Sequence, residues 1–136
     1  MINKDFMEAE IQKLAQVLAR IIGLKNDGNI DDATELANQT VDDEFSLSKD
    51  FLETHSVEEF EEWLNTKNYS PEKLNLLGSL MFESVYPFNE TEETQQVLRK
   101  TALVLNRLET EYHQQSLENL HRRDQIDKFL SNLQYE

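Results

Sequence analysis

The sequence has 136 residues, enough for one domain, and its 27 acidic and 13 basic side chains give a formal charge of -14. This balance argues against nucleic-acid binding, which needs a basic face. The absence of cysteine excludes disulfides, thiolate metal sites and cysteine nucleophiles, while only three glycines and two prolines favour a mostly helical chain.

The first helix is predicted over residues 4–25. Asn26–Asn29, with Gly28, then supplies the residues of a turn, and a second helix extends to Val41. Because this turn is short, the two helices are expected to be antiparallel and to form a first pair within residues 1–43. The apolar stripe of the first helix consists of Met7, Ile11, Leu14, Leu18 and Ile21.

Residues 44–69 are predicted to form an acidic connecting segment with two short helices. Residues 42–62 contain nine acidic side chains and one basic side chain, yet aromatic and aliphatic residues recur through them at helical spacing. The first short helix is expected to start near Ser48. Ser56 and Glu59 predict a capping box at the start of the second.

Residues 70–133 are predicted to form a second pair. Ser70 followed by Pro71 is a strong helix start, and Pro87 predicts the end of that helix. A long apolar pattern then begins near Thr91. The polar residues 113–116 interrupt it without glycine or proline, so either one bent helix or two helices fit the pattern. We favour one long, kinked helix.

Two stretches resemble tetratricopeptide repeats. Residues 28–33, Gly-Asn-Ile-Asp-Asp-Ala, are similar to the turn that opens the second helix of such a repeat. Leu74, Leu77, Gly78 and Met81 resemble its first helix, with glycine where the partner helix packs closely. These resemblances imply tetratricopeptide-like helix pairing.

A further resemblance covers roughly residues 1–85. The segments 3–7, 21–25, 28–33 and 70–74 are similar, in this order, to a family of small bacterial helical proteins with no assigned activity. The resemblance implies a helical, tetratricopeptide-like fold and supplies no catalytic residue.

The expected fold is therefore all-α, a single domain of five or six helices in antiparallel pairs with a long C-terminal helix. No stretch of the sequence is apolar enough for a membrane span, and the start lacks a secretion signal, so a cytoplasmic protein is expected.

No set of residues predicts catalysis, a cofactor site or a metal site. Glu118 and His121 have the spacing found in di-iron bundles, but such a site needs a second motif, and Arg122 and Arg123 would repel a dication. The sequence has no cysteine, and no serine lies in a strand-turn-helix motif near a histidine, so no candidate set for nucleophilic catalysis is present. The protein is therefore expected not to be an enzyme, and a metal-dependent enzyme is the least favoured alternative.

The favoured function is that of a protein–protein interaction module. Trp63 and Tyr86 are the aromatic side chains expected to line a partner groove, beside the acidic residues Glu58, Glu61 and Glu62. Such a surface suits a basic, partly apolar peptide or helix, and its charge would speed the encounter at low salt.

The alternative function is self-association as a homodimer through the C-terminal helix. Residues 94–136 contain six basic and six acidic side chains, so residues 1–93 carry the whole charge of -14. A neutral amphipathic helix can pair with a second copy without electrostatic repulsion. The residues expected at that contact are Leu117, Leu120, Leu130 and Leu133.

Overall fold

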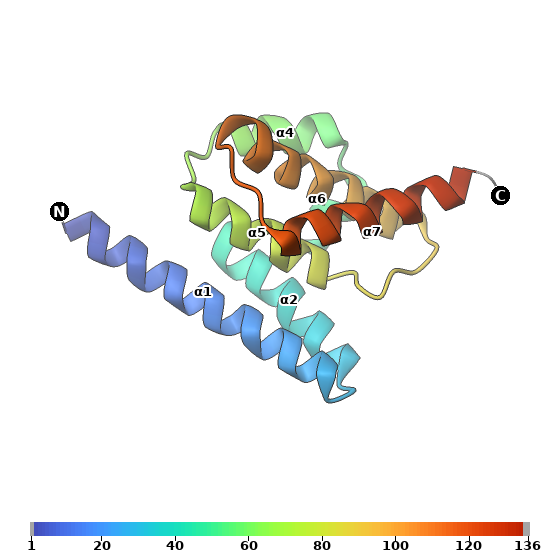
Figure 1. The fold of residues 1–136 in the computed structure, drawn as a ribbon, viewed down its shortest axis with the longest axis horizontal. Helices are drawn as coiled ribbons and strands as arrows, with labels where there is room; N and C mark the ends of the chain where they lie inside the picture. The colour runs from blue at the N-terminus through green and yellow to red at the C-terminus, as the bar shows by residue number, and fades with distance from the viewer. Residues whose placement is uncertain (1, 135–136) are drawn as a thin grey trace.

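The computed structural model describes residues 2–134, and this part of the chain contains seven α-helices and no strand (Figure 1). The expected all-helical fold is confirmed, with seven helices instead of the expected five or six. The helices are α1 (Ile2–Asn26), α2 (Ile30–Phe45), α3 (Lys49–Thr54), α4 (Val57–Asn65), α5 (Pro71–Glu83), α6 (Glu92–Glu111) and α7 (Leu117–Gln134).

The first two helices form the expected antiparallel pair (Figure 1). The chain leaves α1 through Gly28, whose φ of 85° lies in the left-handed region that favours glycine. The backbone N–H of Asn29 then donates to the carbonyl of Leu24 at 2.8 Å, which closes the C-terminal end of α1. Gly28 therefore permits the tight reversal that brings α2 back along α1.

The helix starts expected near Ser48, Ser70 and Thr91 are confirmed. The side chains of Ser48, Ser70 and Thr91 each accept a backbone N–H at the first turn of α3, α5 and α6. At α4 the full capping box is present, because Ser56 and Glu59 each accept the other's backbone N–H. These local bonds fix the beginnings of four helices.

Helix α5 is the centre of the core. It packs against α1, α2 and α6, and every residue from Leu76 to Glu83 is buried. Because Gly78 has no side chain, α6 can pack closely against α5 at this position. A Cβ atom on residue 78 would lie 3.1 Å from Cγ1 of Val104 in α6. The close helix contact expected at Gly78 is therefore present.

The C-terminal region consists of two helices, and the favoured single kinked helix is wrong. Helix α6 ends at Glu111, and His113 adopts a left-handed φ of 53°. The N–H of Gln114 bonds the carbonyl of Leu108 at 2.9 Å, and the Ser116 side chain accepts the N–H of Asn119 at 3.1 Å to start α7. Backbone capping thus breaks the helix without glycine or proline.

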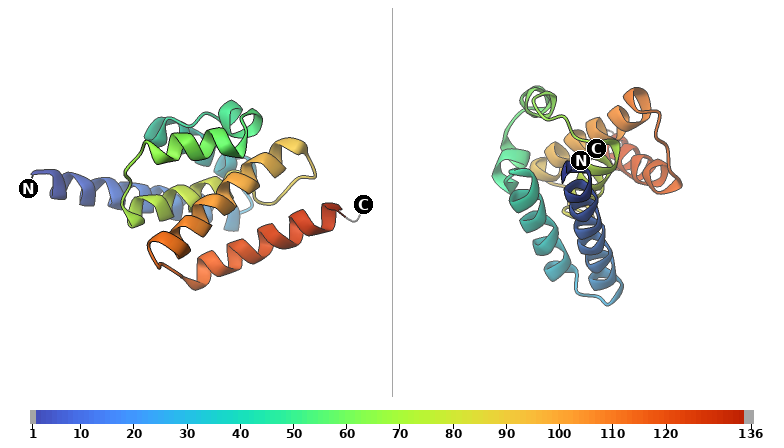
Figure 2. Two further views of the ribbon diagram at one scale, coloured as in Figure 1. Left: turned by 90° about the horizontal axis from the view of Figure 1, so that it is seen from above. Right: turned by 90° about the vertical axis from the view of Figure 1, so that its left-hand side faces the viewer.

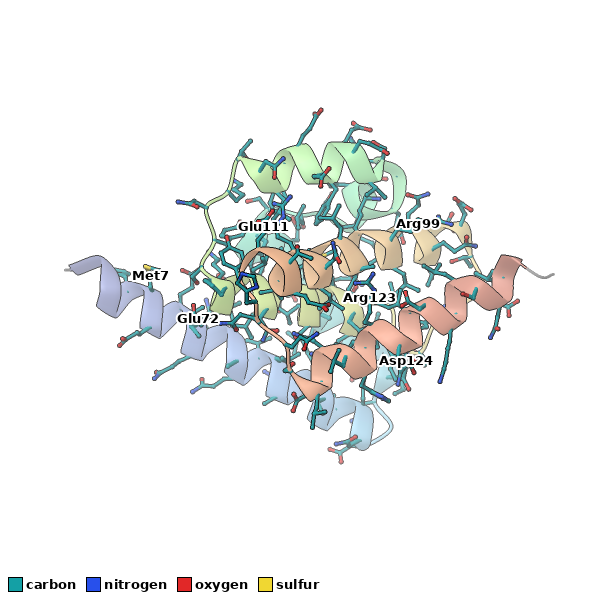
Figure 3. All side chains as sticks on the ribbon, turned by 45° about the horizontal axis from the view of Figure 1, so that its top comes forward. Met7, Glu72, Arg99, Glu111, Arg123 and Asp124 are labelled. Carbon is teal, nitrogen blue, oxygen red and sulfur yellow. The ribbon has the colours of Figure 1, made fainter. Side chains whose placement is uncertain are left out.

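Helix α6 lies between α4 and α7, as Figure 2 shows, and it also packs against α3 and α5. Helix α1 extends past the other helices at its N-terminal end, where Met7 is exposed (Figure 3). Among the described residues, no helix combines the length and apolar character needed to cross a membrane.

Candidate functional site

A hollow lies between α2, α3 and the segment that joins α5 to α6, and we call it the acidic groove. Its volume is about 770 Å³. Three separate parts of the chain form it, so it exists only in the folded protein. It is lined by Ile30, Asp31, Thr34, Glu35, Asn38, Lys49, Glu53, Ser84, Val85, Tyr86, Pro87, Asn89, Thr91, Glu93 and Thr94.

The lining combines negative charge with apolar surface. Its carboxylates are Asp31, Glu35, Glu53 and Glu93, and its one basic side chain is Lys49. The apolar and aromatic lining residues are Ile30, Val85, Tyr86 and Pro87. A lining that combines apolar side chains with carboxylates favours a ligand that is cationic and partly apolar.

A second hollow of about 510 Å³, which we call the side groove, shares Glu53 with the acidic groove. It is also predominantly acidic. The bonds from the Ser56 backbone and hydroxyl hold the pKa of Glu59 below its usual value, so Glu59 is ionised at neutral pH. The side groove is lined by Glu53, Thr54, Ser56, Val57, Glu58, Glu59, Glu92, Gln96 and Arg99.

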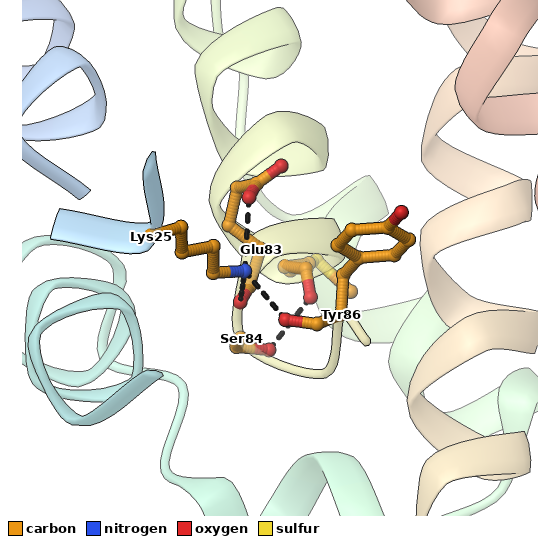
Figure 4. Close-up of polar contacts among 5 residues, drawn as sticks. Lys25, Glu83, Ser84 and Tyr86 are labelled. Atoms are coloured by element: carbon orange, nitrogen blue, oxygen red, sulfur yellow. Dashed lines mark hydrogen bonds and ion pairs between the residues drawn. The ribbon is translucent and has the colours of Figure 1, made fainter. Parts of the chain in front are cut away.

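Lys25 fixes the segment that forms one wall of the acidic groove. Its Nζ donates to Oε1 of Glu83 at 2.9 Å, to the carbonyl of Glu83 at 2.7 Å and to the carbonyl of Tyr86 at 2.6 Å (Figure 4). The side chains of Lys25 and Glu83 are only 10% and 11% exposed. One lysine at the end of α1 therefore satisfies the polar groups at the end of α5.

The two aromatic residues predicted to share a groove belong to different clusters. Tyr86 lines the acidic groove and its ring stacks on Phe82, with centroids 5.3 Å apart. Trp63 stacks on Phe60 at 5.7 Å and lies 6.2 Å from Tyr69. Trp63 lines neither the acidic groove nor the side groove.

The three predicted glutamates also separate. Glu58 lines the side groove, whereas Glu61 and Glu62 line neither hollow, although all three are exposed on α4. Glu61 instead lies 3.6 Å from Arg107 of α6 as an ion pair. Within the predicted set, Tyr86 lines the acidic groove and Glu58 lines the side groove, and the other three residues line neither.

The predicted self-association residues differ in exposure along α7. Leu117 is 82% exposed and Leu120 is 46% exposed, whereas Leu130 and Leu133 are half-buried. The most exposed apolar side chains of α7 therefore lie in its first turn.

Glu118 and His121 of α7 belong to no cluster of metal-ligating side chains among the described residues. His121 contacts Gln125 at 2.6 Å between Nε2 atoms of the two side chains. In the part of the chain that the structure describes, no three histidine, aspartate or glutamate side chains gather closely enough to hold a metal ion.

Most residues of the acidic groove were not predicted from the sequence. Asp31 and Glu35 look like ordinary acidic residues near a helix start, and Glu93 lies in the first turn of another helix. The i, i+4 spacing of Asp31 and Glu35 indicates a shared helix face, but nothing in the sequence places Glu93 opposite it.

Comparison with known proteins gives no relative: no family model, no curated protein and no solved structure matches the chain. The resemblance to small bacterial helical proteins therefore stays a prediction.

Proposed function

We propose that the protein is a non-enzymatic interaction module that binds a basic, partly apolar polypeptide segment in the acidic groove. The observation that supports this most directly is the composition of the groove, in which Tyr86 and Pro87 lie beside carboxylates from α2, α3 and α6. Lysine and arginine side chains of the segment pair with the carboxylates. Apolar side chains of the segment contact the apolar residues of the lining.

The charge of the acidic groove and of the side groove supports a cationic partner. Each hollow has four carboxylates in its lining, Glu53 belongs to both, and the bases are Lys49 and Arg99. Exposed charge pairs are screened by salt, with a Debye length of roughly 8 Å at physiological ionic strength. Affinity for the segment therefore falls as salt rises.

A tetratricopeptide-like arrangement of the helix pairs is part of the same proposal, and two local features support it. The tight turn at Gly28 joins the first pair, and the close approach at Gly78 joins α5 to α6. In such a protein the stacked helix pairs present an extended binding surface.

The test is a direct binding measurement with a fluorescein-labelled peptide of repeating Lys-Arg-Leu units. Glu53→Gln removes the one carboxylate shared by both grooves, and we expect it to weaken peptide binding by about three-fold, the size of a lost exposed ion pair. Fluorescence anisotropy at low salt measures the dissociation constants.

Glu62→Gln is the matched control, because it removes the same charge from an exposed position that lines neither groove. We expect its affinity to equal that of the unaltered protein. A peptide with glutamate in place of lysine and arginine should not bind. Equal weakening by the two substitutions, or no binding of the basic peptide, would contradict the proposal.

Self-association is a second candidate function, favoured by the exposed leucines at the start of α7. Leu117 and Leu120 lie in the region whose acidic and basic side chains are equal in number, while residues 1–93 carry the net charge. A second copy therefore meets less electrostatic repulsion at this surface than elsewhere.

Light scattering of the full-length protein tests this candidate. We expect the mass of a dimer for the unaltered protein and of a monomer for the Leu117→Ser, Leu120→Ser double variant. Both side chains are exposed, so the substitutions leave the core intact. A monomer before any substitution would rule the candidate out.

A further inference from the structure

Residues 84–91, between α5 and α6, form one wall of the acidic groove, and we call them the wall segment. Its side chains contact both the groove and helix α7. Pro87 and Asn89 line the groove, but Phe88 between them does not. The Phe88 ring instead packs against the ring of Phe129 in α7, with centroids 5.2 Å apart and an angle of 61° between the rings. The wall is therefore supported from behind by a helix that contributes nothing to the groove lining.

A chain of aromatic contacts connects this support to Tyr86. The Phe88 ring lies 5.3 Å from Tyr86 and 5.4 Å from Phe82, both edge-on. The guanidinium of Arg122 in α7 also contacts Phe82, at 5.9 Å from the centroid of its ring. Arg122 and Phe129 are about two helical turns apart and so lie on one face of α7.

These contacts matter because α7 has few others. Among residues 117–133, Ile126 is the one fully buried residue, and α7 packs mainly against α6. The aromatic contact of Phe129 is thus a substantial part of what joins α7 to the wall segment. Edge-to-face pairs are selective in geometry, so the position of Phe129 constrains the position of Phe88.

We propose that Phe129 is a positioning residue, which fixes the groove wall through Phe88 and thereby strengthens binding of the basic segment. Its effect on affinity rests on the proposed function, whereas its effect on the wall does not. Because coupling between binding events is reciprocal, a bound segment also holds α7 more firmly against the wall.

The first experiment is a double-mutant cycle on peptide affinity with the Lys-Arg-Leu peptide. Phe129→Leu and Phe88→Leu keep apolar bulk but remove the ring pair, and each is expected to weaken binding by about two- to ten-fold, the range of one aromatic pair. Both substitutions remove the same contact. The affinity of the double variant for the peptide should therefore equal that of whichever single variant binds the peptide less tightly. Additive losses would overturn the proposal.

Phe6→Leu is the matched control, because Phe6 is 73% exposed near the free end of α1 and undergoes the same chemical change. We expect it to leave peptide affinity unchanged. A loss for Phe6→Leu equal to that for Phe129→Leu would overturn the assignment, since it would show a general effect of removing an aromatic ring.

The second experiment measures amide hydrogen exchange of residues 84–91 without peptide. Phe129→Leu should accelerate exchange in this segment, and Phe6→Leu should not. Unchanged exchange in Phe129→Leu would overturn the proposal. If the unaltered protein fails to bind the peptide, the proposed function fails, and the exchange data still decide whether Phe129 holds the wall.

Discussion

Replacing Lys25 with methionine is expected to lower the free energy of unfolding by about 3 kcal/mol, the usual effect of breaking a buried ion pair. The substitution leaves the carboxylate of Glu83 and the carbonyl of Tyr86 without their donor. Glu83 is nearly buried, so water only partly replaces that donor. Thermal unfolding followed by circular dichroism should show a midpoint lower by roughly 10 °C.

Two further variants separate this effect from the general loss of a lysine. Lys13→Met removes the exposed pair with Glu44, whose side chains are 66% and 24% exposed, and should leave the midpoint unchanged. The double variant Lys25→Met, Glu83→Met removes both charges of the buried pair and should regain part of the lost stability. A midpoint for Lys25→Met equal to that of Lys13→Met would refute the importance of the buried pair.

The helix starts were predictable because the interactions that produce them are local. Ser56 and Glu59 are neighbours on one turn, and Ser70 with Pro71 needs no distant partner. The break between α6 and α7 was missed because its signal is weak. His113 is not a residue that ordinarily marks a left-handed turn as glycine does, and Ser116 is the only local cue for the new helix.

The groove was harder to predict because its parts are far apart in sequence. Local composition drew attention to Glu58 and to Tyr86, which both line the grooves, but also to Glu62 and Trp63, which do not. The distinction depends on which face of α4 is turned toward α6, and on the contact between Trp63 and its aromatic neighbours. Tertiary packing, and not charge density, selects the residues that form the hollow.

The same packing buries one basic side chain, in an environment that disfavours its charged form. Lys100 of α6 is fully buried. Among the residues that the structure describes, its Nζ has only long bonds within its own helix, to the carbonyl of Gln96 at 3.4 Å and to Gln96 Oε1 at 3.3 Å. Burial lowers the pKa of Lys100, and the charge of Arg99 lowers it further, although Glu59 opposes this shift. The charged form of Lys100 therefore destabilises the folded state.

Lys100→Met is accordingly expected to raise the free energy of unfolding by about 1–2 kcal/mol, because an apolar chain of similar length fills the same space without the cost of burying a charge. The midpoint of thermal unfolding should rise by roughly 4–8 °C. Lys128→Met, at a side chain 73% exposed on α7, serves as the control and should leave the midpoint unchanged.

The pH dependence gives an independent check on Lys100. In unfolded chains lysine retains its ordinary pKa of 10.5, so between the lowered folded pKa and 10.5 the unfolded state binds more protons. The contribution of Lys100 to the free energy of unfolding therefore becomes more favourable to the folded state as pH rises across that alkaline range. The advantage of Lys100→Met should be largest near neutral pH and shrink as pH approaches 10.5. A constant difference between the two proteins over this range, measured by urea unfolding, would show that burial of the charge is not the cause.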